Sequence, residues 1–429
     1  MSDEIDLTEF LGEDEISESH DDENENTNFL KEFSPKQIGS ISKYIEPISG
    51  FISMDAVSHM FKENTAIDAY PVEENDHVIG IIDRRTVETE TNTAIKRFFS
   101  KTVAETLVNT NVVLQAKEYI ELNLEKLTEL NKKTGMEYYP VFDNRTFVGI
   151  VSFHDFLERI AEIRNQDLEK AAAIQKSFLA NNENLKSFRF SITCWNRMAN
   201  QLGGDFFHAF QMNDRETFAF SCDVSGKNVA ASLLTIAAAS FFEARKSIKD
   251  LPSDPQSIIG DFDEYLSNVV PVGNFITGAF VYIDTKRKIF QIFNCGHTNV
   301  YLVYSGEDQG PKIGAVIPKL PPLGLGDIKK ELKKSKDVTN PKEKPYLTMS
   351  AKRGIHIELY SDGFTDMMND EGFRYEDENA KKFFLNLYRT PASEVYDKIE
   401  STVNSFTGKA LLPDDITVID IRLDSPLFF

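Results

Sequence analysis

Two segments of the N-terminal half repeat one another, and this repeat limits what that half can fold into. Tyr-Pro-Val at residues 70–72 precedes an apolar stretch at 78–82, and the same tripeptide at 139–141 precedes a second apolar stretch at 147–151. The spacing from Tyr-Pro to the Gly within the apolar stretch, Gly80 or Gly149, is the same in both copies. Each copy predicts a short strand, a polar turn and a second strand that leads into a helix. Amphipathic helical stretches at 54–64 and 114–132 precede the two hairpins. The N-terminal half is therefore expected to contain two helix–strand–strand–helix units.

This repeat resembles a pair of CBS domains over residues 38–160, and we place the regulatory pair at residues 36–155. The most specific part of the resemblance is the heptapeptide GIVSFHD at 149–155. In that family, a hydroxyl residue and an Asp at the positions of Ser152 and Asp155 commonly hold the ribose and phosphates of an adenine nucleotide. The resemblance implies that these two residues bind such a ligand.

The residues also allow other interpretations of this motif. Ser152 can cap the N-terminus of its helix, with Asp155 completing a capping box. The first copy has Asp83 and Thr86 at the matching positions, so at most one competent nucleotide site is implied. CBS pairs also act as dimerisation modules without a ligand.

The segments on either side of the repeat differ in composition. Residues 1–28 contain twelve Asp and Glu and neither Lys nor Arg, so we expect a disordered acidic tail over residues 1–35. Neither Gly nor Pro occurs between Phe156 and Leu179, where apolar residues recur at roughly helical spacing, which predicts a helical linker over residues 156–180. This helix either pairs with a second subunit in a homodimer or packs on its own domain.

Composition excludes several classes of function. A net charge of -21 disfavours binding to nucleic acid or to an anionic membrane. No apolar run reaches the roughly 18 residues that a spanning helix requires, so a soluble, cytoplasmic protein is expected. The three cysteines, Cys194, Cys222 and Cys295, lie in apolar contexts without metal-ligand spacing and are expected to be buried and reduced.

The C-terminal half combines strand-like segments with carboxylates at their ends. Alternating or apolar stretches at 188–194, 217–223, 278–283 and 288–294, with a helical run at 229–244, predict antiparallel sheets covered by helices. Four aspartates fall at strand ends beside Gly or a second Asp: Asp205, Asp223, Asp362 and Asp414. Four converging carboxylates would repel one another unless hard divalent cations such as Mn²⁺ or Mg²⁺ held them together. Two such ions can activate water for phosphoryl transfer.

These segments resemble the catalytic domain of the PPM (PP2C-like) phosphatases, in the bacterial SpoIIE/RsbU-type branch. Further matches in family order are TGAF at 277–280, NCGHT at 294–298 and LPPLGL at 320–325. The resemblance implies an α-β-β-α sandwich over residues 181–425. The expected fold class is thus α+β, with an N-terminal CBS pair (a Bateman-type module), a helical linker and this C-terminal sandwich.

The resemblance also implies a set of metal ligands for two divalent ions. Asp205 and Asp223 would bind the two metals with the main-chain carbonyl of Val224, and Asp362 and Asp414 would complete the cluster. Asp415 either joins these ligands or orients a metal-bound water, and the sequence does not separate the two roles.

Other polar residues of this half receive weaker interpretations. No Arg lies close before the Gly-Gly-Asp motif, and Arg197 is too far to serve as a phosphate-binding guanidinium. His297 is expected to be structural rather than a general acid. A cluster of lysines follows Gly326 on what the sequence predicts to be a long loop, which either contacts an acidic partner or is simply solvated.

The sequence thus predicts a metal-dependent protein serine/threonine phosphatase regulated by a CBS-pair sensor. Members of the family typically dephosphorylate a STAS-type anti-anti-sigma protein in a partner-switching pathway, which implies a phosphoprotein of that kind as the substrate. The alternative is a catalytically silent scaffold that senses nucleotide. Retention of all four aspartates argues against that alternative.

Overall fold

The computed structural model describes residues 33–91, 102–107, 112–179, 185–186, 190–226, 229–246, 254–306, 309–335 and 338–423. The chain divides into two compact units, Met1–Gln166 and Asp167–Phe429. Almost all of the predicted acidic tail lies outside the described residues. None of the helices in the described ranges has the length and apolar character needed to cross a membrane.

The first unit contains the repeat that the sequence predicts. The first copy consists of β1 (Ile48–Ser49), α2 (Met54–Glu63), β2 (Ala69–Glu74), β3 (His77–Asp83) and α3 (Arg84–Thr91). The second consists of β4 (Leu114–Gln115), α6 (Ile120–Thr134), β5 (Tyr138–Asp143), β6 (Thr146–Ser152) and α7 (Phe153–Leu179). Each copy forms a three-stranded sheet, in the orders β1-β2-β3 and β4-β5-β6. The CBS identity of this repeat stays a prediction.

The two hairpins share one register. Val72 pairs with Gly80 in the first and Val141 pairs with Gly149 in the second, and each hairpin is irregular directly after that Val. Each copy also buries its own apolar cluster beneath its sheet. The common register explains the constant Tyr-Pro to Gly spacing, because a change of one residue would turn every side chain to the opposite face.

The second unit has a mixed α+β fold built on two antiparallel sheets. Their strands are β7 (Leu185–Lys186), β8 (Ser191–Arg197), β9 (Asp205–Gln211), β10 (Glu216–Val224), β11 (Ile276–Asp284), β12 (Ile289–Cys295), β13 (Val300–Gly306), β14 (Gln309–Val316), β15 (Tyr346–Ser350), β16 (Ile355–Tyr360) and β17 (Ile416–Arg422). One sheet has the order β14-β13-β16-β17-β8-β7 and the other β15-β12-β11-β10-β9.

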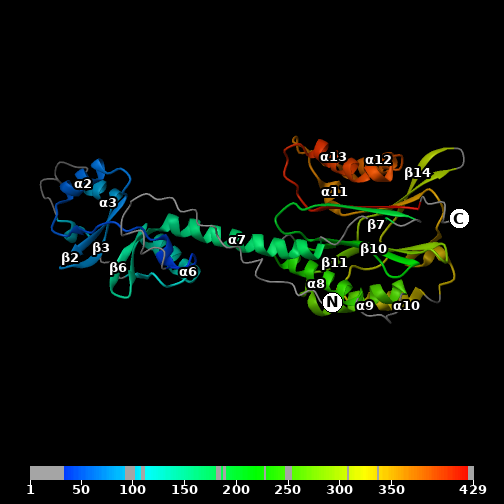
Figure 1. The fold of residues 1–429 in the computed structure, drawn as a ribbon, viewed down its shortest axis with the longest axis horizontal. Coiled ribbons are helices and arrows are strands. Elements are labelled where there is room, and N and C mark those ends of the chain that lie inside the picture. Colours follow the sequence, from blue (N-terminus) through cyan, green and yellow to red (C-terminus); the bar gives the residue numbers. More distant parts are fainter. Residues whose placement is uncertain are drawn as a thin grey trace, which may run out of the picture. The chain divides into compact units, whose positions relative to one another are not determined.

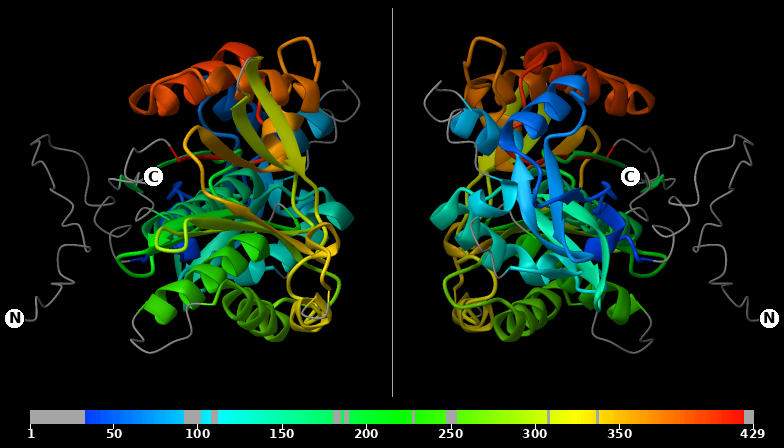
Figure 2. Two further views of the ribbon diagram at one scale, coloured as in Figure 1. Left: turned by 90° about the vertical axis from the view of Figure 1, so that its right-hand side faces the viewer. Right: turned by 90° about the vertical axis from the view of Figure 1, so that its left-hand side faces the viewer.

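Helices cover the outer face of each sheet, as Figures 1 and 2 show for this unit. The five-stranded sheet packs against α8 (Val229–Lys246), α9 (Pro255–Val269) and α10 (Ile328–Lys334). The six-stranded sheet packs against α11 (Asp362–Asp366), α12 (Glu376–Leu387) and α13 (Val395–Thr407). Short 3-10 turns occur at Ile38–Ile41, Pro341–Glu343 and Ala392–Glu394, and α5 (Val103–Thr106) lies in the first unit.

The inner faces of the two sheets form the central core of this unit. Ala219, Val281 and Ile292 of one sheet pack with Ile357 and Ile419 of the other. Strands with both faces buried read as nearly continuous apolar runs, as β10 does in Phe-Ala-Phe-Ser-Cys. The three cysteines lie on β8, β10 and β12, and all three are buried and free of disulfide bonds, as predicted.

The lysine-rich segment after Gly326 differs from its prediction. It was expected to be a long loop, but residues 328–334 form α10, which buries Ile328 and Leu332 against the helices beside the five-stranded sheet. The lysines of this short helix lie on its solvated face. Because charged residues dominate the segment, its two buried apolar positions did not form a recognisable helical pattern in the sequence.

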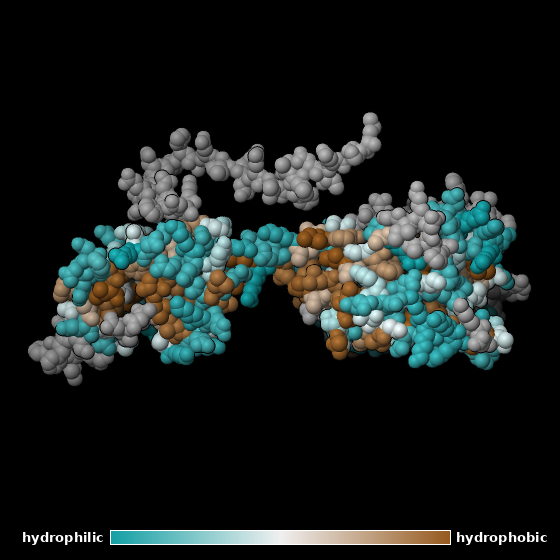
Figure 3. All heavy atoms as spheres, turned by 90° about the horizontal axis from the view of Figure 1, so that it is seen from below, coloured by the Kyte–Doolittle hydropathy of each residue, from teal (hydrophilic) through white to brown (hydrophobic). Residues whose placement is uncertain are grey.

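Some apolar side chains of the second unit remain exposed. They include Val229 and Leu233 on α8 and Val272 after α9. Figure 3 shows hydrophobic residues gathered at the end of this unit that carries α8.

Candidate active site

Asp205 and Asp223 are brought together by strand pairing. Asp205 is the first residue of β9, and it lies directly opposite Asp223 in the antiparallel register with β10. Residues opposite one another in such a pair have Cβ atoms about 5 Å apart. Gly204 permits a close turn before Asp205, because a Cβ there would lie 3.2 Å from the carbonyl oxygen of Val224.

Asp362 and Asp414 come from two turns that touch. Ser361 occupies the N-cap position of α11 after β16 ends, so Asp362 opens this short helix, while Asp414 lies two residues before the start of β17. A Cβ on Gly363 would lie only 1.9 Å from the carbonyl oxygen of Asp415. Glycine is therefore required at position 363, and the two turns pack backbone to backbone.

The carboxylate of Asp415 has a structural task. Its Oδ1 accepts a hydrogen bond from the N–H of Ala199 at 2.7 Å, and its Oδ2 accepts one from the N–H of Gly204 at 2.6 Å. A longer contact of 3.4 Å joins Oδ2 to the N–H of Asp205. The side chain thus holds the Gly-Gly-Asp turn in place, which favours a positioning role for Asp415 over a direct metal contact.

Two hydroxyl residues support this arrangement, and the sequence analysis missed both. Thr417 Oγ1 donates to Asp205 Oδ2 at 2.5 Å. Ser361 Oγ accepts from the N–H of Thr417 at 2.9 Å and donates to the carbonyl of Asp415 at 3.2 Å. The available signal was their position beside Asp362 and Asp415, but a Ser or Thr at a strand end has many structural uses.

A pocket of about 380 Å³ opens over the aspartates. Its lining includes the side chains of Asp223, Asp362 and Asp414, together with Val224 and His297. Asp205 is buried beside it, where burial first and the charge of Asp223 second hold the pKa of its carboxyl well above the usual range. Among the described residues, no Lys or Arg lines this pocket.

The donor set fits divalent cations. Carboxylate and carbonyl oxygens are the ligands that Mg²⁺ and Mn²⁺ prefer, and three aspartates that line one pocket would repel a phosphate dianion. Bound cations would remove that repulsion and would lower the pKa of Asp205.

His297 lines the pocket but is neutral. Burial lowers its pKa to about 4, and its Nδ1 lies 2.9 Å from the hydroxyl oxygen of Thr277. Its own N–H donates to Asn294 Oδ1 at 2.9 Å. A neutral, buried imidazole held at both its ring and its backbone is consistent with the structural role expected from the sequence.

Arg197 is engaged elsewhere in the unit. Its Nη1 donates to Asn404 Oδ1 at 2.8 Å, its Nη2 lies 3.6 Å from a carboxylate oxygen of Glu400, and its guanidinium lies over the ring of Trp195. Arg197 is not among the pocket-lining residues. The expectation that it does not bind phosphate agrees with these contacts.

The C-terminal part of α7 reaches the turn that carries Asp205. Gln175 is 1% exposed, and its Nε2 donates to the carbonyl of Gly203 and to Thr235 Oγ1, both at 2.7 Å. Its Oε1 accepts from the N–H of Gly203 at 3.1 Å. One amide therefore binds both backbone groups of Gly203 and a residue of α8.

Ser152 and Asp155 form a cap at the start of α7. Ser152 Oγ accepts from the N–H of Asp155 at 2.9 Å and donates to Asp155 Oδ2 at 2.7 Å, and Lys43 Nζ lies 3.1 Å from Asp155 Oδ1. Although burial raises it, hydrogen bonds from Ser152 and the ammonium of Lys43 leave the pKa of Asp155 below its ordinary value. Asp83 caps α3 in the same way through the N–H of Thr86. The capping interpretation is thus realised in both copies, and nucleotide binding by Ser152 and Asp155 stays a prediction.

A second group of ligand-type side chains lies farther along β16 and β17. His356, Glu358 and Asp420 have candidate ligand atoms within 4.8 Å of one another, and all three are buried. Arg422 Nε donates to Asp420 Oδ1 at 2.6 Å, and its guanidinium also donates to the carbonyls of Thr390 and Leu387. Burial, followed by the charge of Asp420, raises the pKa of Glu358 far above its ordinary value. We call this group the buried quartet.

Comparisons with known proteins found one family model and several solved structures that are similar to this chain. Residues 213–424 match the family model for Stage II sporulation protein E (SpoIIE). The SiaA-PP2C domain of Pseudomonas aeruginosa is similar in structure, with a TM-score of 0.49 and 18% identity over 62% of this chain and 99% of that chain. No curated protein matches the sequence significantly.

Two further solved structures are similar to this chain. The RsbU and RsbW domains of a Mycobacterium tuberculosis protein give a TM-score of 0.43 and 18% identity, over 56% of this chain and 61% of that chain. The phosphatase domain of SpoIIE from Bacillus subtilis, with a fragment of its regulatory domain, gives 0.41 and 17%, over 56% and 64%.

The family match includes the segments that carry Asp223, Asp362 and Asp414, while Asp205 lies just before it. The match supports phosphoprotein phosphatase activity for this part of the chain. The second unit therefore carries a segment, residues 213–424, that is similar to the SpoIIE family.

Proposed function

We propose that the chain is a metal-dependent protein serine/threonine phosphatase whose N-terminal unit regulates it. The observation that carries the proposal is the pocket lined by Asp223, Asp362 and Asp414, with Asp205 buried beside it. A phosphate monoester would be repelled there by the carboxylates alone, so the site suits a phosphate that arrives at bound cations.

The residues divide into ligands and supports. Asp205, Asp223, Asp362 and Asp414, with the carbonyl of Val224, would hold two Mn²⁺ or Mg²⁺ ions. When bound, these ions would neutralise the phosphate and activate water. Asp415, Thr417 and Ser361 keep the ligands in place through the hydrogen bonds described above, so that the carboxylates converge before a metal arrives.

The test is hydrolysis of para-nitrophenyl phosphate by the full chain with Mn²⁺, with Mg²⁺ and with a chelator. We expect turnover that the chelator abolishes and added metal restores. Asp223→Asn should remove it, while the matched exposed variant Asp397→Asn on α13 should behave as wild type. Chelator-resistant turnover, or an active Asp223→Asn variant with unchanged metal dependence, would refute the metal assignment.

We propose further that an adenine nucleotide binds the first unit at Ser152 and Asp155. The family resemblance and the position of both residues at the start of α7 support this. Titration of the full chain with ATP, ADP and AMP by calorimetry should give heat that a Ser152→Ala, Asp155→Ala double variant loses. A comparison of the double variant with wild type in the absence of nucleotide shows whether loss of the helix cap alone alters the protein. Absence of heat with all three ligands would leave only a structural role for the repeat.

Gln175 offers a route by which the first unit would regulate the second. It lies in α7, which begins at the proposed nucleotide site and ends at the turn before Asp205. A change in the order of this helix would therefore act on Gly203. In the assay above, a proposed nucleotide effect on turnover should be reduced in Gln175→Leu and preserved in the exposed neighbour variant Lys176→Ala.

We propose that the chain forms a homodimer through the repeat and α7. Exposed Ile174 and Phe178 on α7 support this, because unpaired apolar side chains on a helix favour a partner helix. Sedimentation should show a dimer that Ile174→Asp weakens and Ser177→Asp leaves intact; a wild-type monomer would refute it.

The proposed substrate is a phosphorylated STAS-type protein. This proposal rests on the family resemblance and is tested by release of phosphate from such a phosphoprotein.

A further inference from the structure

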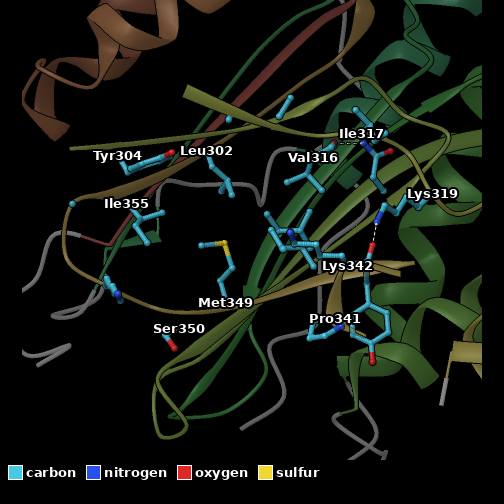
Figure 4. Close-up of a pocket in the computed structure, with 18 of the residues that line it drawn as sticks. Leu302, Tyr304, Val316, Ile317, Lys319, Pro341, Lys342, Met349, Ser350 and Ile355 are labelled. Atoms are coloured by element: carbon cyan, nitrogen blue, oxygen red, sulfur yellow. Dashed lines mark hydrogen bonds between the residues drawn. The ribbon is translucent and has the colours of Figure 1, made fainter. Parts of the chain in front are cut away.

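An open cleft lies where the two sheets of the second unit end side by side. β14 is the last strand of one sheet and β15 is the last strand of the other. The cleft has a volume of about 890 Å³, which is in the range of sites that bind sizeable ligands. Figure 4 shows its lining, with Leu302 and Tyr304 on one side and Met349 and Ser350 on the other. We call it the edge cleft.

The floor of the edge cleft continues the core between the sheets. Leu302 and Ile355 are members of that core, and Val316 and Leu347 pack against it while remaining partly accessible. Farther out, Tyr304 is 41% exposed, Ile317 56% and Met349 37%. The described residues therefore leave one side of this central apolar core open, which a folded protein rarely does without a function for that surface.

The rim of the edge cleft is basic. Four of its lining residues are cationic, namely Lys319, Lys342, Lys352 and Arg353, and none of the described lining residues is acidic. Lys319 Nζ donates to the carbonyl of Lys342 at 2.7 Å, which ties the segment that bears Lys342 across the opening (Figure 4). In a chain with a net charge of -21, this local excess of positive charge attracts an anionic partner.

The wall of the edge cleft adjoins the catalytic pocket. Asn294 lines the cleft, and its Nδ2 donates to the carbonyls of Val316 and Thr298. Its Oδ1 accepts from the N–H of His297, which lines the catalytic pocket. One side chain thus joins the two surfaces, so a partner bound in the cleft would lie next to the loop that borders the aspartates.

We propose that the edge cleft docks an extended segment of the phosphoprotein substrate that combines apolar and acidic side chains. The inference rests on the proposed phosphatase function and specifies the chemistry by which the substrate is recognised. Apolar side chains of the segment enter between the sheets, and its carboxylates face the lysines and Arg353. In the described part of the chain, the outer edges of β14 and β15 pair with no further strand, so their backbone groups can also bind an extended segment.

The probes are three fluorescent phosphoserine peptides that differ only in the flank beside the phosphoserine. One flank alternates Leu and Glu, the second alternates Leu and Lys, and the third alternates Gly and Ser. With the full chain, we expect the Leu-Glu peptide to bind at least about tenfold more tightly than either of the others in fluorescence anisotropy. It should also be dephosphorylated with a correspondingly lower KM.

Two variants test whether the peptide occupies the edge cleft. A Cβ on Gly314 would meet no atom within 4 Å, and its backbone is not in the left-handed region, so this position can carry a side chain, and Gly314→Trp is chosen to fill the cleft. Lys342→Glu with Lys352→Glu reverses the rim charge. Both should remove the advantage of the Leu-Glu peptide. Lys382→Glu, on the exposed face of α12, makes the same kind of charge change away from the cleft and should retain it.

Hydrolysis of para-nitrophenyl phosphate separates this inference from the proposed function. All three variants should hydrolyse it as wild type does, because the small ester needs no docking segment. Equal binding of the three peptides, or a preference that Gly314→Trp leaves intact, would overturn the docking proposal while the phosphatase proposal stands. A change in sedimentation caused by Gly314→Trp would instead assign the cleft to contact between copies of the chain and would also overturn it.

Discussion

Two groups of acidic side chains lie on β16 and β17 or in the turns beside them, yet their surroundings are opposite. Asp362 and Asp414 lie at the ends of the strands and face a pocket that no basic side chain lines among the described residues. Glu358 and Asp420 lie within the strands and are buried. Arg422 forms an ion pair with Asp420, and burial raises the pKa of Glu358, which favours its protonated, uncharged form. Carboxylates that line an open pocket suit exchangeable metal ions, whereas buried carboxylates with a guanidinium and a retained proton suit a structural role.

The sharpest test replaces one acid by its amide in each group. Asp362→Asn should lower turnover of para-nitrophenyl phosphate on the order of 1000-fold, because a lost metal ligand removes several kcal/mol of transition-state stabilisation. Glu358→Gln, four residues earlier, should keep turnover within about twofold of wild type. Steady-state kinetics at saturating Mn²⁺ measures both. Equal losses in the two variants would mean that the groups are not functionally distinct.

Removing the guanidinium of the buried quartet should affect stability rather than chemistry. Arg422→Met leaves Asp420 without its charge partner and frees the carbonyls of Thr390 and Leu387. The expected loss is about 3–5 kcal/mol in the free energy of unfolding, since an uncompensated charge remains buried. Urea denaturation monitored by circular dichroism measures it. The double variant Arg422→Met, Asp420→Leu should recover much of that loss, and failure to recover would contradict the pairing.

Positioning by Thr417 should be visible in metal affinity. Thr417→Val preserves the shape of the side chain and removes the hydrogen bond to Asp205, so we expect the Mn²⁺ concentration for half-maximal activity to rise about 10–100-fold. Thr417→Ser retains the hydroxyl and is the matched control. If Val and Ser variants need the same Mn²⁺ concentration, the hydroxyl does not orient Asp205.

The smallest expected effect is a pH dependence of stability. Because the folded state raises the pKa of Glu358, it retains a proton that the unfolded chain releases above about pH 4.5, so this group costs stability increasingly as pH rises. Glu358→Gln should therefore stabilise the chain by about 1–2 kcal/mol at pH 8 and have less effect near pH 5. Thermal unfolding at both pH values, with chelator present, measures the difference. A stabilisation that is larger at pH 5 would reverse the assignment of the proton.

Sequence patterns predicted most elements of the fold and placed four aspartates at strand ends, because both depend on local signals. The helix expected over 114–132 was wrong at its start, since residues 114–115 form β4 and the helix begins at Ile120. Strands buried on both faces, such as β10, read as apolar runs, and the aspartates stand at the ends of such runs beside Gly or Asp. Thr417 and Ser361 gave no comparable signal, since their importance comes from pairings between segments more than fifty residues apart. The role of Asp415 likewise depends on the N–H groups of Ala199 and Gly204, which only the folded chain brings near.

Two further features escaped prediction for physical reasons. Successive side chains of β16 point to opposite faces of the sheet, and Glu358 lies on the face away from the core between the sheets. A charged residue on such a face is ordinarily expected to be solvated. Here helices cover that face, so Glu358 is buried. The edge cleft depends on which strands end their sheets, a property of topology that no single segment reveals. The CBS resemblance, the nucleotide site and the metal ligands stay predictions that the experiments above address.

The amide of Gln175 has a practical consequence for dividing the chain. The family match begins at residue 213, and the first strand of the six-stranded sheet with substantial length begins at Ser191. A fragment that starts at Ser191 would keep Gly203 and Asp205 but lose the side chain of Gln175, which binds Gly203. A fragment that starts at residue 213 would lose Gly203 and Asp205 as well. We therefore expect a catalytic fragment that starts upstream of Gln175, inside α7, to be more active than either shorter version.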